Sequence, residues 1–183
     1  MKRIVLTFGL IAGAILSAMM LATLPFVEAI GFDRGEIIGY TSMVLAFLLI
    51  FFGVRSYRDN VAGGTVGFGR AFVVGALISI VASVCYVVTW EVIYFKLMPD
   101  FGSKYQVHVL EKARQAGESE EAIAERKATM DRFVELYQNP AINAAITFLE
   151  PLPVALIVSL VSAVVLSRRK NRPSLASFGA TAP

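Results

Sequence analysis

The chain has 183 residues, of which 56% are hydrophobic and 17% are charged, and it carries a formal net charge of +3. Soluble domains average about 45–50% apolar and about 25% charged residues, so this composition argues against an ordinary soluble domain. The apolar residues also form long runs, and a helix needs about 20 of them to cross the hydrocarbon core of a bilayer. We therefore predict an all-α integral membrane bundle of four transmembrane helices, with spans at about residues 4–30, 37–54, 71–97 and 141–166.

The first predicted span resembles a secretory signal in some respects. Lys2 and Arg3 precede its apolar run, and Val27-Glu28-Ala29 imitates a cleavage site with small residues. The apolar run is much longer than the ~7–15 residues usual in such a signal. We expect the span to be retained, and the alternative of cleavage stays open.

Small residues recur at four-residue spacing in the first and third predicted spans. This spacing places small side chains on one helix face, where a second helix can approach closely. We expect these faces to pack inside the bundle, and a homodimer through them is the alternative. The residues concerned are Gly9, Gly13 and Ser17 in the first span and Ala71, Gly75, Ser79 and Ser83 in the third.

The charged segment 98–140 separates the third and fourth spans and is predicted to form a helical hairpin. Its first helix should end before Gly117, because glycine readily adopts the backbone conformation that stops a helix. Ser119 can then cap the second helix. Asn139-Pro140 should end that helix and begin the fourth span, since proline is accepted in a first helical turn.

The distribution of basic residues predicts the orientation in the membrane. Cytoplasmic loops carry an excess of Lys and Arg, so both termini and the second loop are expected to be cytoplasmic and the hairpin extracytoplasmic. Residues 1–170 should form one membrane domain, and residues 171–183 a disordered cytoplasmic tail. The basic residues that carry this prediction are Lys2, Arg3, Arg55, Arg58, Arg70, Arg168, Arg169, Lys170 and Arg172.

The fourth span contains the stretch TFLEPLPVAL, in which a carboxylate is followed by two prolines. Pro151 and Pro153 cannot donate backbone hydrogen bonds, and Pro151 clashes with the carbonyl of Thr147. We predict a kinked helix with freed carbonyls at Thr147 and Leu149. Irregular backbone is tolerated at such depth only where protein or water covers it. Glu150 should therefore face the interior of the bundle.

Glu150 and Glu91 define a candidate polar site, because a charge at the bilayer centre costs about 2.5–3.5 kcal/mol. In the structural interpretation, which we favour, Glu150 accepts hydrogen bonds from Tyr40, Tyr86 or Trp90. In the functional interpretation, Glu150 and Glu91 share a proton or a cation. The candidate site comprises Glu91, Glu150, Thr147, Tyr86, Trp90 and Tyr40.

Three stretches of the chain carry a resemblance to a known family. They are GEIIGYTSMVLAFLLIFFGVRSYRDN, GFGRAFVVGALISIVASVCYVVTWEVIY and FLEPLPVALIVSLVSAVV. The chain resembles a bacterial four-helix membrane family known as domain of unknown function 4199, over most of its length from Lys2 to Lys170. The resemblance implies a bacterial cytoplasmic membrane and four spans. It implies no activity and no catalytic residue.

The function expected from the sequence is that of a non-enzymatic accessory or interaction protein. The alternative is a small proton- or cation-coupled carrier that uses Glu91 and Glu150. We predict no catalytic residue, metal or cofactor, because no nucleophile–base pair or metal-binding cluster is visible. The expected partners are the lipid bilayer and either another membrane protein or a second copy of the chain, and no nucleic acid.

Overall fold

The fold was analysed on a computed structural model that describes residues 1–167. These residues form helices and connections without a strand, and four helices are long and apolar enough to cross a membrane. The prediction of an all-α chain with four such helices is confirmed, while the predicted tail at 171–183 lies outside the described residues. The elements are α1 (Lys2–Thr23), η1 (Leu24–Phe26), α2 (Val27–Ile30), α3 (Phe32–Asn60), α4 (Phe68–Val92), η2 (Ile93–Leu97), α5 (Phe101–Gln115), α6 (Glu120–Tyr137), α7 (Pro140–Leu149) and α8 (Leu152–Ser167).

The first span is less regular than the sequence predicted. A 3-10 turn that contains Pro25 separates α1 from α2, because proline cannot donate the backbone hydrogen bond of a continuous helix. Gly31 then ends α2 with a positive φ of 74°, a conformation that glycine adopts without strain. The chain reverses there and enters α3.

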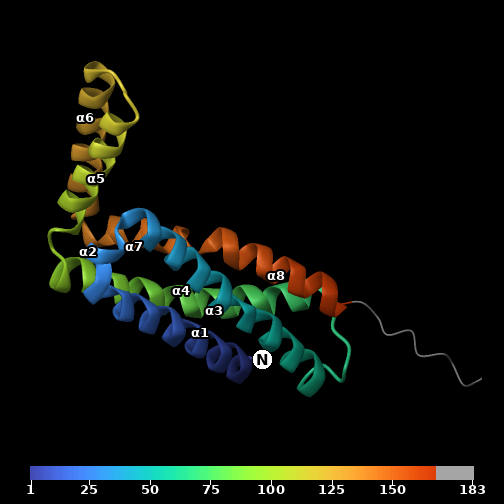
Figure 1. Ribbon diagram of the computed structural model, residues 1–183. Helices are drawn as coiled ribbons and strands as arrows, with labels where there is room; N and C mark the ends of the chain where they lie inside the picture. The colour runs from blue at the N-terminus through green and yellow to red at the C-terminus, as the bar shows by residue number, and fades with distance from the viewer. Residues whose placement is uncertain (168–183) are drawn as a thin grey trace, which may run out of the picture.

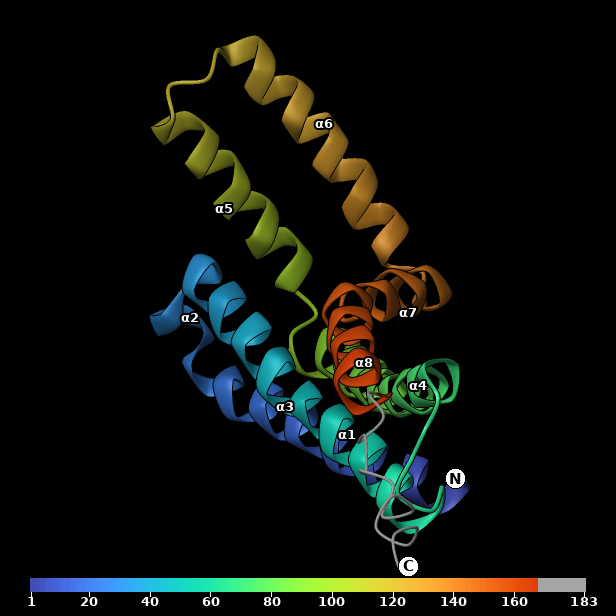
Figure 2. The same cartoon turned by 90° about the vertical axis from the view of Figure 1, so that its right-hand side faces the viewer.

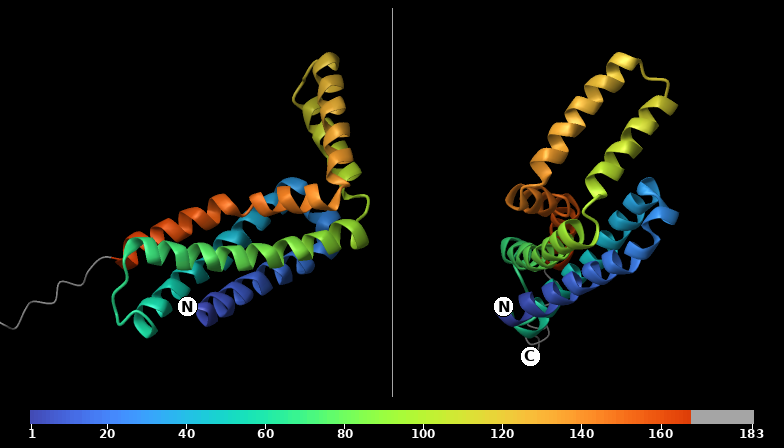
Figure 3. Two further views of the ribbon diagram at one scale, coloured as in Figure 1. Left: turned by 180° about the vertical axis from the view of Figure 1, so that it is seen from behind. Right: turned by 90° about the vertical axis from the view of Figure 1, so that its left-hand side faces the viewer.

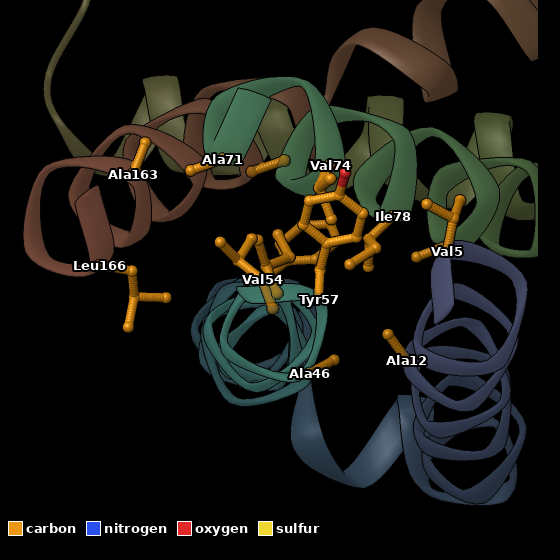
Figure 4. Packing of buried hydrophobic residues seen from close by; sticks show 14 of the residues in the cluster. Val5, Ala12, Ala46, Val54, Tyr57, Ala71, Val74, Ile78, Ala163 and Leu166 are labelled. Atoms are coloured by element: carbon orange, nitrogen blue, oxygen red, sulfur yellow. The ribbon is translucent and has the colours of Figure 1, made fainter. Parts of the chain in front are cut away.

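Four apolar helices pack side by side around one core, in which α1 and α8 both lie against α4 (Figure 1). Figure 4 shows side chains from all four helices meeting there. Gly13 of α1 faces α4 so closely that an added Cβ would lie 2.6 Å from the Cβ of Cys85. Gly75 of α4 is packed in the same way against Ser159 of α8. Both small-residue faces therefore serve as contacts within the chain.

Helices α5 and α6 form a hairpin that projects from one end of the bundle (Figure 2). Gly117 has a φ of 75° in the connection between them. The Ser119 hydroxyl accepts a hydrogen bond from the backbone N–H of Ala122, which is the predicted cap of α6. Ile123 of α6 is buried against Leu110 of α5, so the first turn of α6 packs on the other helix of the hairpin.

The fourth span is interrupted at Glu150-Pro151, between α7 and α8, as Figure 3 shows. The side chain of Asn139 caps α7 by accepting hydrogen bonds from the backbone N–H groups of Ala141 and Ile142. Pro140 occupies the first helical turn of α7. The break places Glu150 at the end of α7, beside the third span rather than in the middle of a straight helix.

Candidate functional site

A stripe of polar side chains runs along one face of α7. Asn143, Thr147 and Glu150 follow one another at intervals of four and three residues, which keeps them on the same side of a helix. Asn143 and Thr147 are buried, with 0% and 1% of their surface exposed. Glu150 keeps an exposed surface and lines a partly open cavity. Two of the three side chains are therefore buried inside the protein, and the third, Glu150, is exposed to the cavity.

Glu150 is held by a tyrosine of the third span. The Tyr86 hydroxyl donates a hydrogen bond of 2.9 Å to Glu150 Oε2. Tyr86 is buried at 8% exposure, so its hydroxyl has little access to water. Hydrogen bonds to charged groups are stronger than neutral ones, and this one ties α4 to the break after α7. Of the three donors considered for Glu150, the structure brings Tyr86 into contact.

Trp90 and Thr147 belong to a second, connected set of hydrogen bonds. The Trp90 indole N–H donates to the Tyr137 hydroxyl at 3.1 Å, and that hydroxyl lies 2.9 Å from Thr147 Oγ1. Thr147 donates in turn to Asn143 Oδ1, whose amide nitrogen donates to the Tyr137 carbonyl. Because each hydroxyl has one hydrogen, the direction of the chain is fixed from Trp90 through Tyr137 and Thr147 to Asn143. These bonds join α4, α6 and α7.

Tyr137 and Asn143 were not identified from the sequence as members of the site. Tyr137 lies in the segment predicted to form a hairpin outside the membrane, and Asn143 lies in an apolar run. The spacing of Asn143, Thr147 and Glu150 on one helix face is the signal that could have revealed Asn143. No local pattern shows that Tyr137, at the end of the hairpin, turns back toward the third span.

A cavity of about 610 Å³ lies between the end of the bundle and the hairpin. Residues from the end of α1, from α3 to α7 and from η2 line it, and its walls are mostly apolar. Glu150 and Tyr86 lie on its surface, and so do Trp90 and Tyr40. The aromatic members of the wall are Tyr40, Tyr86, Trp90, Tyr94, Tyr105 and Tyr137, with the rings of Phe32, Phe101 and Phe133.

Glu91 is separated from this cavity. It follows Tyr86 by five residues on α4, which places it about 140° around the helix from Tyr86. It does not line the cavity, and its buried Oε1 has no hydrogen-bond partner among the described residues. The structure therefore groups Glu150 with Tyr86, Trp90 and Tyr40, joins Thr147 to them through Tyr137, and places Glu91 on another face.

Ion pairs tie the hairpin to the connection between the first and second spans. The amino group of Lys112 lies 2.8 Å from Asp33, and His108 Nε2 lies 3.3 Å from the same carboxylate oxygen. The hydrogen bond to Asp33 raises the pKa of Lys112 above its usual value. Lys104 pairs with Glu28 at 3.1 Å, and its pKa is also raised, chiefly by Asp100 and then by Glu28. Asp33, His108 and Lys112 also line the cavity.

The edge of the cavity is reinforced by packed aromatic rings. Phe32, at the start of α3, lies 5.5 Å from the Phe101 ring and 5.4 Å from the Tyr105 ring, in edge-to-face contacts. Trp90 packs on Phe101 in the same manner, with 5.0 Å between ring centroids. Edge-to-face pairs of this kind add specific attraction to the burial of apolar area. The base of the hairpin is therefore held to α3 and α4 by its rings.

Four apolar helices of this length, packed into one bundle, are typical of a multi-pass membrane protein. A model of the family described as "Protein of unknown function (DUF4199)" matches residues 7–168, and the chain belongs to this family. No curated protein and no solved structure matches the chain.

Replacing Tyr137 by Phe should destabilise the protein by about 1–3 kcal/mol, because the Trp90 N–H loses its acceptor in a partly buried position. The free energy of unfolding in a mild detergent measures this loss, and the emission of Trp90 should change as well. Tyr105→Phe is the matched control, since the Tyr105 hydroxyl makes no side-chain hydrogen bond with the described residues. Equal effects of the two substitutions would contradict the described network.

Proposed function

We propose that this chain is a non-enzymatic accessory protein of the bacterial cytoplasmic membrane that binds a small molecule in the cavity below its hairpin. The observation that carries the proposal is the cavity of about 610 Å³ with Glu150 and Tyr86 on its wall. Its volume lies within the range of about 300–1,000 Å³ that is typical of small-molecule sites. Mostly apolar walls with a few polar groups are also typical of such sites.

The state of the polar groups supports binding rather than catalysis. Trp90, Tyr137, Thr147 and Asn143 bond to one another, so their hydrogen bonds maintain the wall of the cavity. Glu150 is the polar group of α7 that remains accessible from the cavity. An accessible carboxylate can orient a ligand. In this proposal the hairpin, which is linked to the bundle by rings and ion pairs, communicates the bound state to a membrane partner.

A small proton- or cation-coupled carrier is the second candidate function, and the accessibility of Glu150 is the observation that favours it. A carboxylate that can exchange a proton or a cation with the cavity is what such a carrier requires. The carrier function further requires flux across reconstituted vesicles that is abolished by Glu150→Gln. Ligand binding without flux would assign the protein to the accessory class.

The orientation forms part of the proposal, with both termini in the cytoplasm and α5 and α6 outside. It rests on the basic residues of the connections and on the positive-inside rule. In a Cys85→Ala background, a membrane-impermeant maleimide should label Ala128→Cys of α6 on intact cells. Thr65→Cys, between α3 and α4, should react only after the cells are opened. The reverse pattern would overturn the orientation and place the cavity on the cytoplasmic side.

The binding function is tested by native mass spectrometry of protein released gently from its membrane. The wild-type chain should carry a bound small molecule that is lost from Ile38→Trp, because Ile38 lines the cavity and the larger side chain fills it. Ile37→Trp is the matched control, because Ile37 is 67% exposed and does not line the cavity. Unfolding temperatures should show that both variants fold. A wild-type chain without bound mass, or an Ile38→Trp variant that keeps it, would refute the proposal.

A further inference from the structure

The charges on the cavity wall are unequal. Asp33, Glu36 and Glu150 are acidic, and Lys112 and His108 are the basic groups that face the same space. Lys112 and His108 both contact Asp33 near the edge of the cavity. Among the described residues, Glu36 and Glu150 form no ion pair. The wall of the cavity therefore carries excess negative charge among mostly apolar side chains.

Glu150 also has hydrogen-bonding capacity to spare. A carboxylate can accept about four hydrogen bonds, and the described side chains supply one, from Tyr86 to Oε2. Pro151 and Pro153 follow directly, so the backbone after Glu150 offers no N–H at these positions. The open positions around the carboxylate face the cavity. They suit a ligand that brings its own N–H donors and a positive charge.

Aromatic rings and flexible apolar side chains line the same cavity as this carboxylate. The faces of Trp90, Tyr86 and Tyr40 offer the negative surfaces that attract an organic cation. Met19 and Met20 at the end of α1 supply adaptable apolar contacts. A bare metal ion would require several oxygen ligands, six to eight for calcium, whereas Glu150 and Tyr86 provide one carboxylate and one phenol. The chemistry of the wall thus favours an organic cation with an apolar portion.

We infer that the cavity binds an amphipathic organic amine, whose ammonium group pairs with Glu150 while its apolar chain lies against the methionines and aromatic rings. This inference rests on the proposed binding function and names the chemical class of its ligand. A free long-chain amine and the amine headgroup of a lipid share this chemistry. The two sources are separated below by the composition of the vesicles.

The test uses the full chain in phosphatidylcholine vesicles, titrated with decylammonium, decanol and decanoate. Trp90 is the single tryptophan of the chain and lines the cavity, so its emission reports occupancy directly. Decylammonium should give a saturable change in this emission at a lower concentration than decanol or decanoate. Glu150→Gln should weaken decylammonium binding by about tenfold or more, because a shielded charge pair is lost. Glu91→Gln, on α4 and outside the cavity, should leave decylammonium binding unchanged.

Glu150→Asp is the second variant, because it keeps a carboxylate at this position. It should keep the preference for decylammonium over decanol and decanoate, even if Glu150→Gln folds poorly. Added phosphatidylethanolamine that competes with decylammonium would assign the site to a lipid amine, and lack of competition would assign it to a free amine.

Equal affinity of the wild-type chain for decanol or decanoate would overturn the amine assignment, as would undiminished binding by a folded Glu150→Gln variant. Loss of the preference for decylammonium in a folded Glu150→Asp variant would also contradict it, because a carboxylate is still present there. In each case the binding function would still be supported if the wild-type chain carries a bound small molecule that Ile38→Trp lacks. Failure of every probe, together with a wild-type chain that carries no bound mass, would refute both the ligand class and the binding function.

Discussion

A carboxylate inside an apolar helix needs a polar partner or access to water, because its transfer to the centre of a bilayer costs about 2.5–3.5 kcal/mol. Glu150 meets this constraint in two ways. The Tyr86 hydroxyl donates to one of its oxygens, and the cavity leaves the remaining positions accessible. A hydrogen bond to a charged group contributes about 1.5–3 kcal/mol, which is comparable with the cost of insertion. The arrangement of the surrounding helices keeps both conditions in place.

The break between α7 and α8 is what makes this arrangement possible. Pro151 and Pro153 prevent a continuous hydrogen-bonded helix, so α7 ends at the carboxylate instead of passing it. Asn143 and Thr147 lie on α7 and fix its position through their hydrogen bonds with Tyr137, at the end of α6. The hairpin is therefore attached to the interior of the bundle by hydrogen bonds as well as by rings at its base. Thr147, which takes part in this attachment, lies one helical turn before Glu150.

Much of the fold could be predicted from the sequence because it depends on local properties. Long apolar runs located the four membrane helices, and Ser119, Asn139 and Pro140 marked helix starts through interactions with their own neighbours. The prolines after Glu150 likewise indicated a break without reference to any other element. The turn at Pro25 was missed, because the apolar run continues through it and hydropathy does not record backbone hydrogen bonds.

The composition of the site was only partly predictable, because it depends on contacts between distant segments. Periodicity indicates which residues share a helix face but leaves the facing partner undetermined, so Tyr86, Trp90 and Tyr40 were equivalent candidates for Glu150. Tyr137 joins the site only because the hairpin returns to the third span. Glu91 was grouped with Glu150 on depth alone, and its rotation about α4 places it on another face.

The contact between Glu150 and Tyr86 is tested most directly by a double-mutant cycle. The free energy of unfolding is measured at neutral pH for the wild type, Glu150→Gln, Tyr86→Phe and the double variant. The described hydrogen bond predicts a coupling energy of about 1–3 kcal/mol between the two positions. Effects that add without coupling would show that the two side chains do not interact and would contradict the account of the cavity.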